Sequence, residues 1–215
     1  MLTSPLDTSL YRFLHWWFPS VVRGLFDFQV SGVENLPRSG PVVLASNHLS
    51  NLDPFFLGAA CPRQIHWMAK SELWKSRLLG QAIEWLGGFP VRRGQADRES
   101  IRAALRILDA GAVLGIFPEG RRQPSGHLGQ PAPGVGLFSS RPGVVTIPVA
   151  ITGTNEIRSG SRLHFGKVTV SFGRPVDTEV AGAGRAERNS IVSYRIMEAL
   201  AALLAQEWRP KEEAG

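Results

Sequence analysis

The chain contains a single cysteine, Cys61, among its 215 residues. One thiol can form neither an internal disulfide nor a cysteine-rich zinc site, so a fold held by either is excluded. A low cysteine content is typical of a reducing compartment, and we expect Cys61 to be a small buried apolar residue rather than a nucleophile. The chain must therefore be stabilised by its apolar core, and its length and 43% apolar residues suit one domain.

Long uncharged apolar runs are also missing from the sequence. No stretch of about 18 such residues occurs, so we expect no membrane-spanning helix. The first residues lack the basic start, apolar core and small-residue cleavage site of a secretory signal, and none is expected. Residues 10–28 are instead rich in aromatic side chains, interrupted by Arg12, Arg23 and Asp27. Pro19 is expected to kink or split a helix here.

Such an aromatic segment allows two interpretations. It predicts either a helix lying at the level of lipid headgroups or an aromatic helix packed on the core of its own domain. Trp67, Trp74 and Trp85 lie in the next apolar region and favour the membrane interpretation.

Charge is distributed unevenly along the chain. The sequence has 24 basic and 18 acidic residues, and positions 63–141 hold 12 of the basic residues but only 6 of the acidic ones. A basic centre predicts an anionic partner, which is a phosphorylated small molecule, an anionic lipid or a nucleic acid, unless this segment is merely a solvated basic face.

The pattern of apolar and turn-forming residues predicts strands that alternate with helices. The expected strands are 41–46, 65–69, 112–117, 144–151 and 163–172, with a strand and turn over 30–37 and a strand-edge loop over 87–94; the expected helices are 53–60, 72–86, 96–110 and 185–208. Gly111 is the expected C-cap of the third helix. The sequence therefore predicts an α/β fold with a largely parallel mixed sheet flanked by helices. An aromatic, amphipathic helical segment over 1–29 precedes the domain 30–215.

His48 and Asp53 lie five positions apart, where an expected strand leads into an expected helix. An ideal helix turns about 100° per residue, so positions five apart point roughly 140° away from each other. The two side chains can meet only if the chain turns between them. Residues 50–54 predict this turn, with Asp53 as the helix N-cap and Pro54 at the first helical position. An imidazole held by a carboxylate can act as a general base; a capping or core histidine is the alternative.

Four short motifs follow one another along the chain. They are Asn47-His-x4-Asp53, Gly88-Phe-Pro-Val-Arg-Arg-Gly94, Phe117-Pro-Glu-Gly-Arg-Arg122 and Ile147-Pro-Val-Ala-Ile151. In this order the motifs resemble those of the glycerolipid acyltransferase family, which acylates lysophosphatidic acid or glycerol 3-phosphate. The resemblance covers about residues 30 to 180 and would make 30–215 an acyltransferase domain.

The resemblance implies acyl transfer from acyl-CoA or acyl carrier protein to the free hydroxyl of lysophosphatidic acid, giving phosphatidic acid in phospholipid biosynthesis. His48 would remove the hydroxyl proton, a step that typically contributes about 10²–10⁴-fold. Asp53 would accept a hydrogen bond from the other ring nitrogen and fix the tautomer. A thioester is already activated, so no covalent intermediate is needed. No cofactor and no metal are expected, and no Gly-x-Ser-x-Gly elbow accompanies Ser46 or Ser50.

The resemblance also assigns the residues expected to bind the acceptor. Arg93 and Arg122 match motif arginines and are expected to grip the acceptor phosphate. The full set of expected phosphate-site residues is Lys70, Arg93, Glu119, Gly120 and Arg122. Glu119 is expected chiefly to order its loop, and Pro148 to shape a loop beside the acyl site or to serve a purely structural role. The chain departs from the family pattern at Arg92, at Arg121 and at Ala132-Pro-Gly134, so acceptor selectivity could differ.

Other functions remain open at this point. The acceptor could be glycerol 3-phosphate, a lysophospholipid or a lyso-ornithine lipid, and a non-catalytic protein that binds anionic lipid or nucleic acid is a further alternative. A metal hydrolase is disfavoured because His48 and Asp53 supply too few ligands. We expect a peripheral protein at the cytoplasmic face of the cell membrane. Its partners would be the lipid surface, a lysophospholipid and acyl-CoA or acyl carrier protein, with no nucleic acid.

Overall fold

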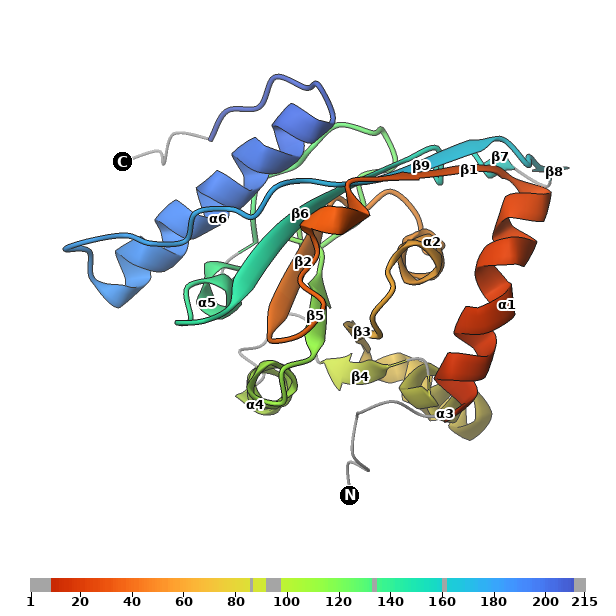
Figure 1. The fold of residues 1–215 in the computed structure, drawn as a ribbon, viewed down its shortest axis with the longest axis horizontal. Coiled ribbons are helices and arrows are strands. Elements are labelled where there is room, and N and C mark those ends of the chain that lie inside the picture. Colours follow the sequence, from red (N-terminus) through yellow and green to blue (C-terminus); the bar gives the residue numbers. More distant parts are fainter. Residues whose placement is uncertain (1–8, 86, 92–97, 133–134, 160–161, 211–215) are drawn as a thin grey trace.

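The strand β2 (Val42–Ser46) is buried at every position. Its side chains alternate between two apolar layers, with Val42 and Leu44 in one layer and Val43 and Ala45 in the other. A strand that is apolar on both faces must be covered on both, which is the arrangement of an α/β sheet. The computed structural model describes residues 9–85, 87–91, 98–132, 135–159 and 162–210 (Figure 1).

The central sheet has seven strands. Their order across the sheet is β1 (Asp27–Ser31), β9 (Lys167–Phe172), β6 (Val145–Thr152), β2, β5 (Val113–Ile116), β3 (Ile65–Lys70) and β4 (Gly88–Val91). Neighbouring strands from β6 to β4 are parallel, whereas β9 is antiparallel to β6 and parallel to β1. A separate hairpin joins β7 (Arg158–Ser159) and β8 (Arg162–Leu163). The predicted largely parallel mixed sheet is confirmed.

Helices cover both faces of this sheet (Figure 1). One face packs against α4 (Arg98–Asp109), α5 (Val135–Ser139) and α6 (Arg185–Leu203), and the other against α1 (Ser9–Leu25) and α2 (Asp53–Ala60). In α4, the apolar residues Ala104, Ile107 and Leu108 are buried at helical spacing. Gly111 follows the helix with φ +71, and its N–H donates to the Leu108 carbonyl at 2.8 Å. The predicted glycine cap is therefore confirmed.

The predicted helix 72–86 is divided into two elements. A short 3₁₀ helix, η2 (Ser71–Lys75), precedes α3 (Arg77–Trp85), and another, η1 (Val33–Asn35), follows β1. The division brings the Trp74 ring against Gly80, where a Cβ atom would lie 2.7 Å from the ring. The Trp74 indole N–H also donates to Glu84 at 2.8 Å. This folding back of Trp74 requires a turn that one continuous helix would not provide.

The N-terminal helix α1 continues through Pro19 as one element, so the predicted split does not occur. Proline removes only one hydrogen bond of the helix, and Phe18 and Val22 pack on the core on either side of it. Elsewhere the helix exposes large apolar residues, including Trp16 at 81% and Leu25 at 51%. No helix in the described part of the chain is sufficiently long and apolar to cross a bilayer.

The junction between this helix and the domain lies earlier than predicted. The expected boundary between residues 29 and 30 falls inside β1, whose five residues pair with β9. Backbone hydrogen bonds to β9 thus make residues 27–31 part of the sheet, and the helical segment ends before Asp27.

Cys61 follows the last residue of α2 and is fully buried. Its N–H donates to the Leu57 carbonyl at 3.0 Å, and burial raises the pKa of its thiol to about 12. The prediction that Cys61 is a buried apolar residue is confirmed.

Candidate active site

The site begins where β2 ends, at Asn47. This side chain makes a pair of hydrogen bonds with the backbone of Ile151 in β6: Asn47 Nδ2 donates to the carbonyl at 2.9 Å, and the Ile151 N–H donates to Asn47 Oδ1 at 2.8 Å. The amide side chain therefore continues the pairing of β2 with β6 beyond the last strand residue. It fixes the first turn of the loop that carries His48.

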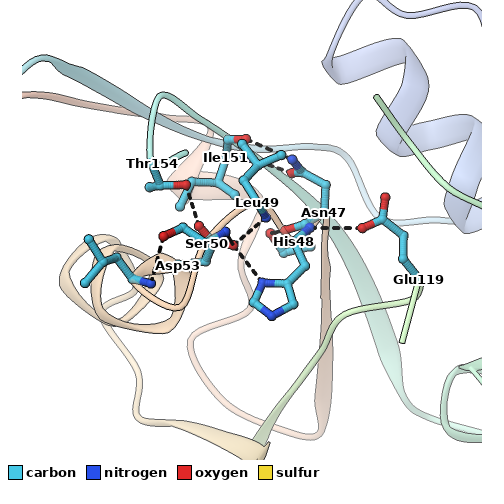
Figure 2. Close-up of polar contacts among 10 residues, drawn as sticks. Asn47, His48, Leu49, Ser50, Asp53, Glu119, Ile151 and Thr154 are labelled. Atoms are coloured by element: carbon cyan, nitrogen blue, oxygen red, sulfur yellow. Dashed lines mark hydrogen bonds and ion pairs between the residues drawn. The ribbon is translucent and has the colours of Figure 1, made fainter. Parts of the chain in front are cut away.

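His48 and Asp53 contact each other as predicted (Figure 2). His48 Nδ1 lies 2.7 Å from Asp53 Oδ2, and both side chains are buried. A carboxylate only accepts hydrogen bonds, so Nδ1 carries the proton and Nε2 carries the lone pair of the neutral ring. Figure 2 shows Nε2 pointing away from Asp53 and Glu119. The chain turn therefore orients the histidine so that its second nitrogen can accept a proton.

Asp53 is not the N-cap that the sequence predicts. It is the first residue of α2, and Leu52 occupies the cap position without a side-chain hydrogen bond. Asp53 Oδ2 accepts instead from the loop N–H groups of Leu49 at 2.6 Å and Ser50 at 2.8 Å. The carboxylate points back into the loop because the imidazole and these amides lie on that side. Pro54 is accordingly the second residue of the helix rather than the first, and it lies in the first turn, where proline is tolerated.

The second oxygen of Asp53 has a partner from a distant part of the sequence. Thr154 Oγ1 donates to Asp53 Oδ1 at 2.5 Å, across 101 positions of the chain. Thr154 follows β6 and is 1% exposed. The sequence does not predict this contact, because a single threonine beyond a strand carries no signal for a partner so far away.

Aromatic rings form a stack on His48. Phe117 lies parallel to the imidazole, with centroids 3.8 Å apart and planes 14° apart. Trp67 in turn stacks on Phe117, with ring centroids 5.0 Å apart and planes 15° apart. The predicted membrane role of Trp67 therefore receives no support, since its ring packs against the core and Phe117. Phe117 is the first residue of the third motif, but its stacking on His48 depends on the neighbouring ends of β2 and β5 and was not predicted.

Glu119 ties the third motif to the first. Its Oε2 accepts from the His48 N–H at 3.1 Å, and its Oε1 accepts from the Gly129 N–H at 3.0 Å. Burial raises the pKa of this carboxyl, and the two backbone hydrogen bonds oppose that shift. The His48 carbonyl in turn accepts from Gln123 at 2.6 Å. Both Glu119 oxygens thus hold loop amides, which is the loop-ordering arrangement.

The residues expected to bind phosphate are only partly described. Gly120 adopts a left-handed φ of +66, and its N–H closes a turn onto the Phe117 carbonyl at 3.0 Å. Arg122 follows that turn and is exposed. Arg93 lies outside the described residues. Lys70 ends β3, but its side chain is not described.

Pro148 lies inside β6 and is buried, and that it shapes a loop beside the acyl site stays a prediction. Its carbonyl accepts from Gly173 at 2.8 Å, one residue beyond β9. The N–H and C=O of one strand residue point to the same side, so the missing N–H falls where pairing with β9 ends. The strand tolerates proline there, which agrees with the purely structural alternative.

Residues 27–152 match the family model described as Acyltransferase. The chain belongs to the acyltransferase family. His48, Asp53 and Glu119 lie within the matched residues, whereas Thr154 lies beyond them.

Named relatives of this acyltransferase domain support the assignment. The chain is 27% identical over 183 residues to the chloroplastic 1-acyl-sn-glycerol-3-phosphate acyltransferase LPAT1 of Arabidopsis thaliana, which covers 82% of this chain and 51% of the relative. It is 29% identical over 183 residues to the 1-acyl-sn-glycerol-3-phosphate acyltransferase of Pseudomonas aeruginosa, covering 80% and 70%. The Bacillus subtilis enzyme of that name is 37% identical over 95 residues, covering 44% and 48%. The chain spans about half the length of the first of these relatives.

A solved acyltransferase has the same fold. The crystal structure of the 1-acyl-sn-glycerophosphate acyltransferase PlsC from Thermotoga maritima superposes with a TM-score of 0.70 at 24% identity, covering 91% of this chain and 81% of that one. The predicted α/β architecture is therefore that of a structurally characterised acyltransferase.

Proposed function

We propose that this chain transfers a fatty acyl group from acyl-CoA or acyl carrier protein to the free hydroxyl of lysophosphatidic acid, which yields phosphatidic acid for phospholipid synthesis. The observation that carries the proposal is the 2.7 Å contact between His48 Nδ1 and Asp53 Oδ2, which leaves Nε2 as a proton acceptor. Family membership supplies the reaction class. The relatives' names supply the acceptor.

The chemistry requires one base and no covalent enzyme intermediate. His48 Nε2 takes the proton of the acceptor hydroxyl while its oxygen attacks the thioester carbonyl carbon. The tetrahedral intermediate collapses, the carbon–sulfur bond breaks, and the thiolate takes the proton back from the imidazolium. The products are an ester and a free thiol. The Asp53 carboxylate stabilises the imidazolium during these steps and holds the ring in one orientation.

The loop after β5 would place the acceptor beside His48. Glu119 orders this loop through His48 and Gly129, and a carboxylate is not itself suited to bind phosphate. Arg122 leaves the turn at Gly120 with an exposed guanidinium, the group that best matches a phosphate. We assign the acceptor phosphate to Arg122, together with Arg93 and Lys70 as the family motifs suggest.

Exposed apolar residues of α1 would hold the enzyme at a lipid surface. Trp16, Val21 and Leu25 are exposed on this helix, and Phe55 on α2 is exposed two residues after Asp53. A helix with one apolar side in the domain and another in solvent suits peripheral insertion at the headgroup level. The arrangement supports a peripheral protein; we place it at the cytoplasmic face of the cell membrane because the proposed donors, acyl-CoA and acyl carrier protein, are found there.

The test measures thiol release and lipid product together. Purified protein is given acyl-CoA or acyl carrier protein, with and without lysophosphatidic acid in mixed micelles, and products are identified by mass spectrometry. We expect acceptor-dependent thiol release, formation of phosphatidic acid, and loss of both in His48→Ala. His164→Ala provides the matched control, because His164 is exposed.

The same assay separates the alternatives. Release that requires glycerol 3-phosphate, another lysophospholipid or a lyso-ornithine lipid would replace the acceptor but keep the reaction. Full activity in His48→Ala would contradict the proposed base. No transfer across the whole panel, together with salt-sensitive retention on DNA, would favour the binding-protein alternative.

A further inference from the structure

Thr154 is the one hydroxyl in the described part of the chain that touches the carboxylate partner of His48. Its Oγ1 lies 2.5 Å from Asp53 Oδ1, whereas the three other donors to Asp53, His48, Leu49 and Ser50, all bind Oδ2. Without Thr154, Asp53 Oδ1 would have no protein donor among the described residues. Asp53 is fully buried, so bulk water does not replace a lost donor at this position.

The backbone around Thr154 is fixed on two sides. Gly153 has a left-handed φ of +85, and a Cβ atom there would lie 2.0 Å from the Lys167 carbonyl, so this turn packs directly on β9. Two residues before it, Ile151 is bound through its N–H and its carbonyl to Asn47. The end of β6 is therefore attached both to the residue before His48 and to Asp53.

We propose that Thr154 is a positioning residue for acyl transfer: its hydroxyl holds Oδ1 of Asp53 so that Oδ2 stays directed at His48. A carboxylate rotates about one terminal bond, and donors on a single oxygen leave that rotation less constrained. A fixed donor on each oxygen sets the plane of the group and hence the orientation of the imidazole. This inference rests on the proposed function and adds a residue beyond the matched family region.

Strand β6, which Thr154 follows, provides a matched control. Thr146 in β6 is 1% exposed, and its Oγ1 has no hydrogen-bond partner in the structure. Thr146→Val and Thr154→Val both replace a buried hydroxyl by a methyl group at nearly constant volume. Only Thr154→Val removes a donor to Asp53.

The experiment compares kcat and acceptor KM for wild type, Thr154→Val, Thr154→Ser and Thr146→Val. We expect Thr154→Val to lower kcat by about 10-fold to 100-fold, by analogy with the removal of hydrogen-bond partners that orient metal-bound histidines. The acceptor KM should change little, Thr154→Ser should retain most of the activity, and Thr146→Val should match wild type. Equal kcat in Thr154→Val and wild type would overturn the inference.

A second measurement does not require turnover. The chain has five histidines, so the ¹⁵N signals of the His48 ring can be identified as those that disappear in His48→Ala. Thr154→Val should shift both ring nitrogens of His48, and Thr146→Val should leave them in place. Unchanged His48 resonances in folded Thr154→Val would overturn the positioning role. Absence of acyl transfer in wild type would instead overturn the proposed function, and the spectra would still decide the role of Thr154.

Discussion

Side chains at the site differ in whether water can replace a lost partner. The carboxylate of Asp53 is fully buried, whereas the guanidinium of Arg122 is exposed. Loss of a buried hydrogen-bond partner disturbs the orientation of the reacting groups, whereas loss of an exposed cation weakens only the binding of an anion. Substitutions at these two residues should therefore change different kinetic parameters.

Asp53→Asn tests the charge of the carboxylate. An amide fills the same volume but supplies a single acceptor, and it carries no charge to stabilise the imidazolium. We expect kcat to fall by about 10²–10⁴-fold with the fold retained. Circular dichroism and steady-state kinetics measure the two effects, with the exposed Asp109→Asn as control. Retained turnover would reduce Asp53 to a structural residue.

Arg122→Ala tests the phosphate role. Loss of a guanidinium that contacts phosphate should raise the acceptor KM by about tenfold or more, since a hydrogen bond to a charged group contributes about 1.5–3 kcal/mol. The neighbouring Arg121 is also exposed and serves as the matched control. An equal rise in KM for Arg121→Ala would indicate general charge attraction. An unchanged KM in Arg122→Ala would contradict specific binding.

Among the elements, β3 and β5 determine how aromatic rings stack on His48. Trp67 pairs with Gly115 across these strands, and a Cβ atom on Gly115 would lie 2.5 Å from the Trp67 ring. The glycine therefore leaves room for the indole to lie flat. Phe117 lies in contact with both rings, so a shift of this indole would also displace the imidazole of His48.

Gly115→Ala should destabilise the protein by about 1–3 kcal/mol, the cost of overpacking a filled core. It should also lower kcat, because displacement of Trp67 disturbs the ring stack. Gly58→Ala, in α2, is the matched control: nothing lies within 4 Å of an added Cβ there. This control should stabilise by about 0.5–1 kcal/mol. Urea denaturation measures both, and stabilisation by Gly115→Ala would contradict the packing argument.

Strand β3 also carries a buried histidine, His66. Burial lowers the pKa of this histidine below its ordinary value of 6.5, and a hydrogen bond to the Gly87 backbone opposes the shift. The unfolded chain then binds the proton more readily than the folded chain. The contribution of neutral His66 to stability should be fully present above its ordinary pKa. It should fall as the pH drops below that value and level off below the pKa of His66 in the folded protein.

His66→Gln should flatten this dependence, because glutamine does not titrate. Urea midpoints between about pH 5 and 8 provide the measurement. The exposed His164→Gln should leave the wild-type slope intact. A wild-type slope of the opposite sign would contradict the assignment.

For the molecule as a whole, the sequence predicted what depends on local pattern. The alternation of strands and helices, the Gly111 cap and the meeting of His48 with Asp53 follow from neighbouring residues, and the structure has all three. The contacts that complete the site come from distant segments. Thr154 reaches Asp53 only because β6 lies beside β2, an order of strands that no local pattern specifies.

The same limit explains the remaining differences. Asp53 was expected to cap α2, but the imidazole and two loop amides bind its carboxylate from the other side. Trp67 was expected to face lipid, but its strand neighbour is Gly115, which leaves room for the ring to pack on the sheet. Competing tertiary partners decided both outcomes.

The exposed apolar residues of α1 predict how the whole molecule contacts lipid. Trp16→Ser combined with Leu25→Ser should reduce binding to vesicles that contain anionic phospholipid by about tenfold. Val33→Ser, on η1, also removes an exposed apolar side chain and should bind like wild type. Cosedimentation at low and high salt separates apolar from charge-driven binding. Equal cosedimentation of the double variant and wild type would exclude α1 as the contact.

The burial of Cys61 has a practical consequence for detecting turnover. The only sulfhydryl of the chain is fully covered, and its pKa of about 12 keeps it un-ionised at neutral pH. A colour-forming disulfide reagent should therefore report coenzyme or carrier sulfhydryl in real time, with no background from the folded enzyme. The same reagent reacts with Cys61 once the end of α2 opens. In the absence of acyl donor, the rate of its reaction with Cys61 therefore reports local unfolding.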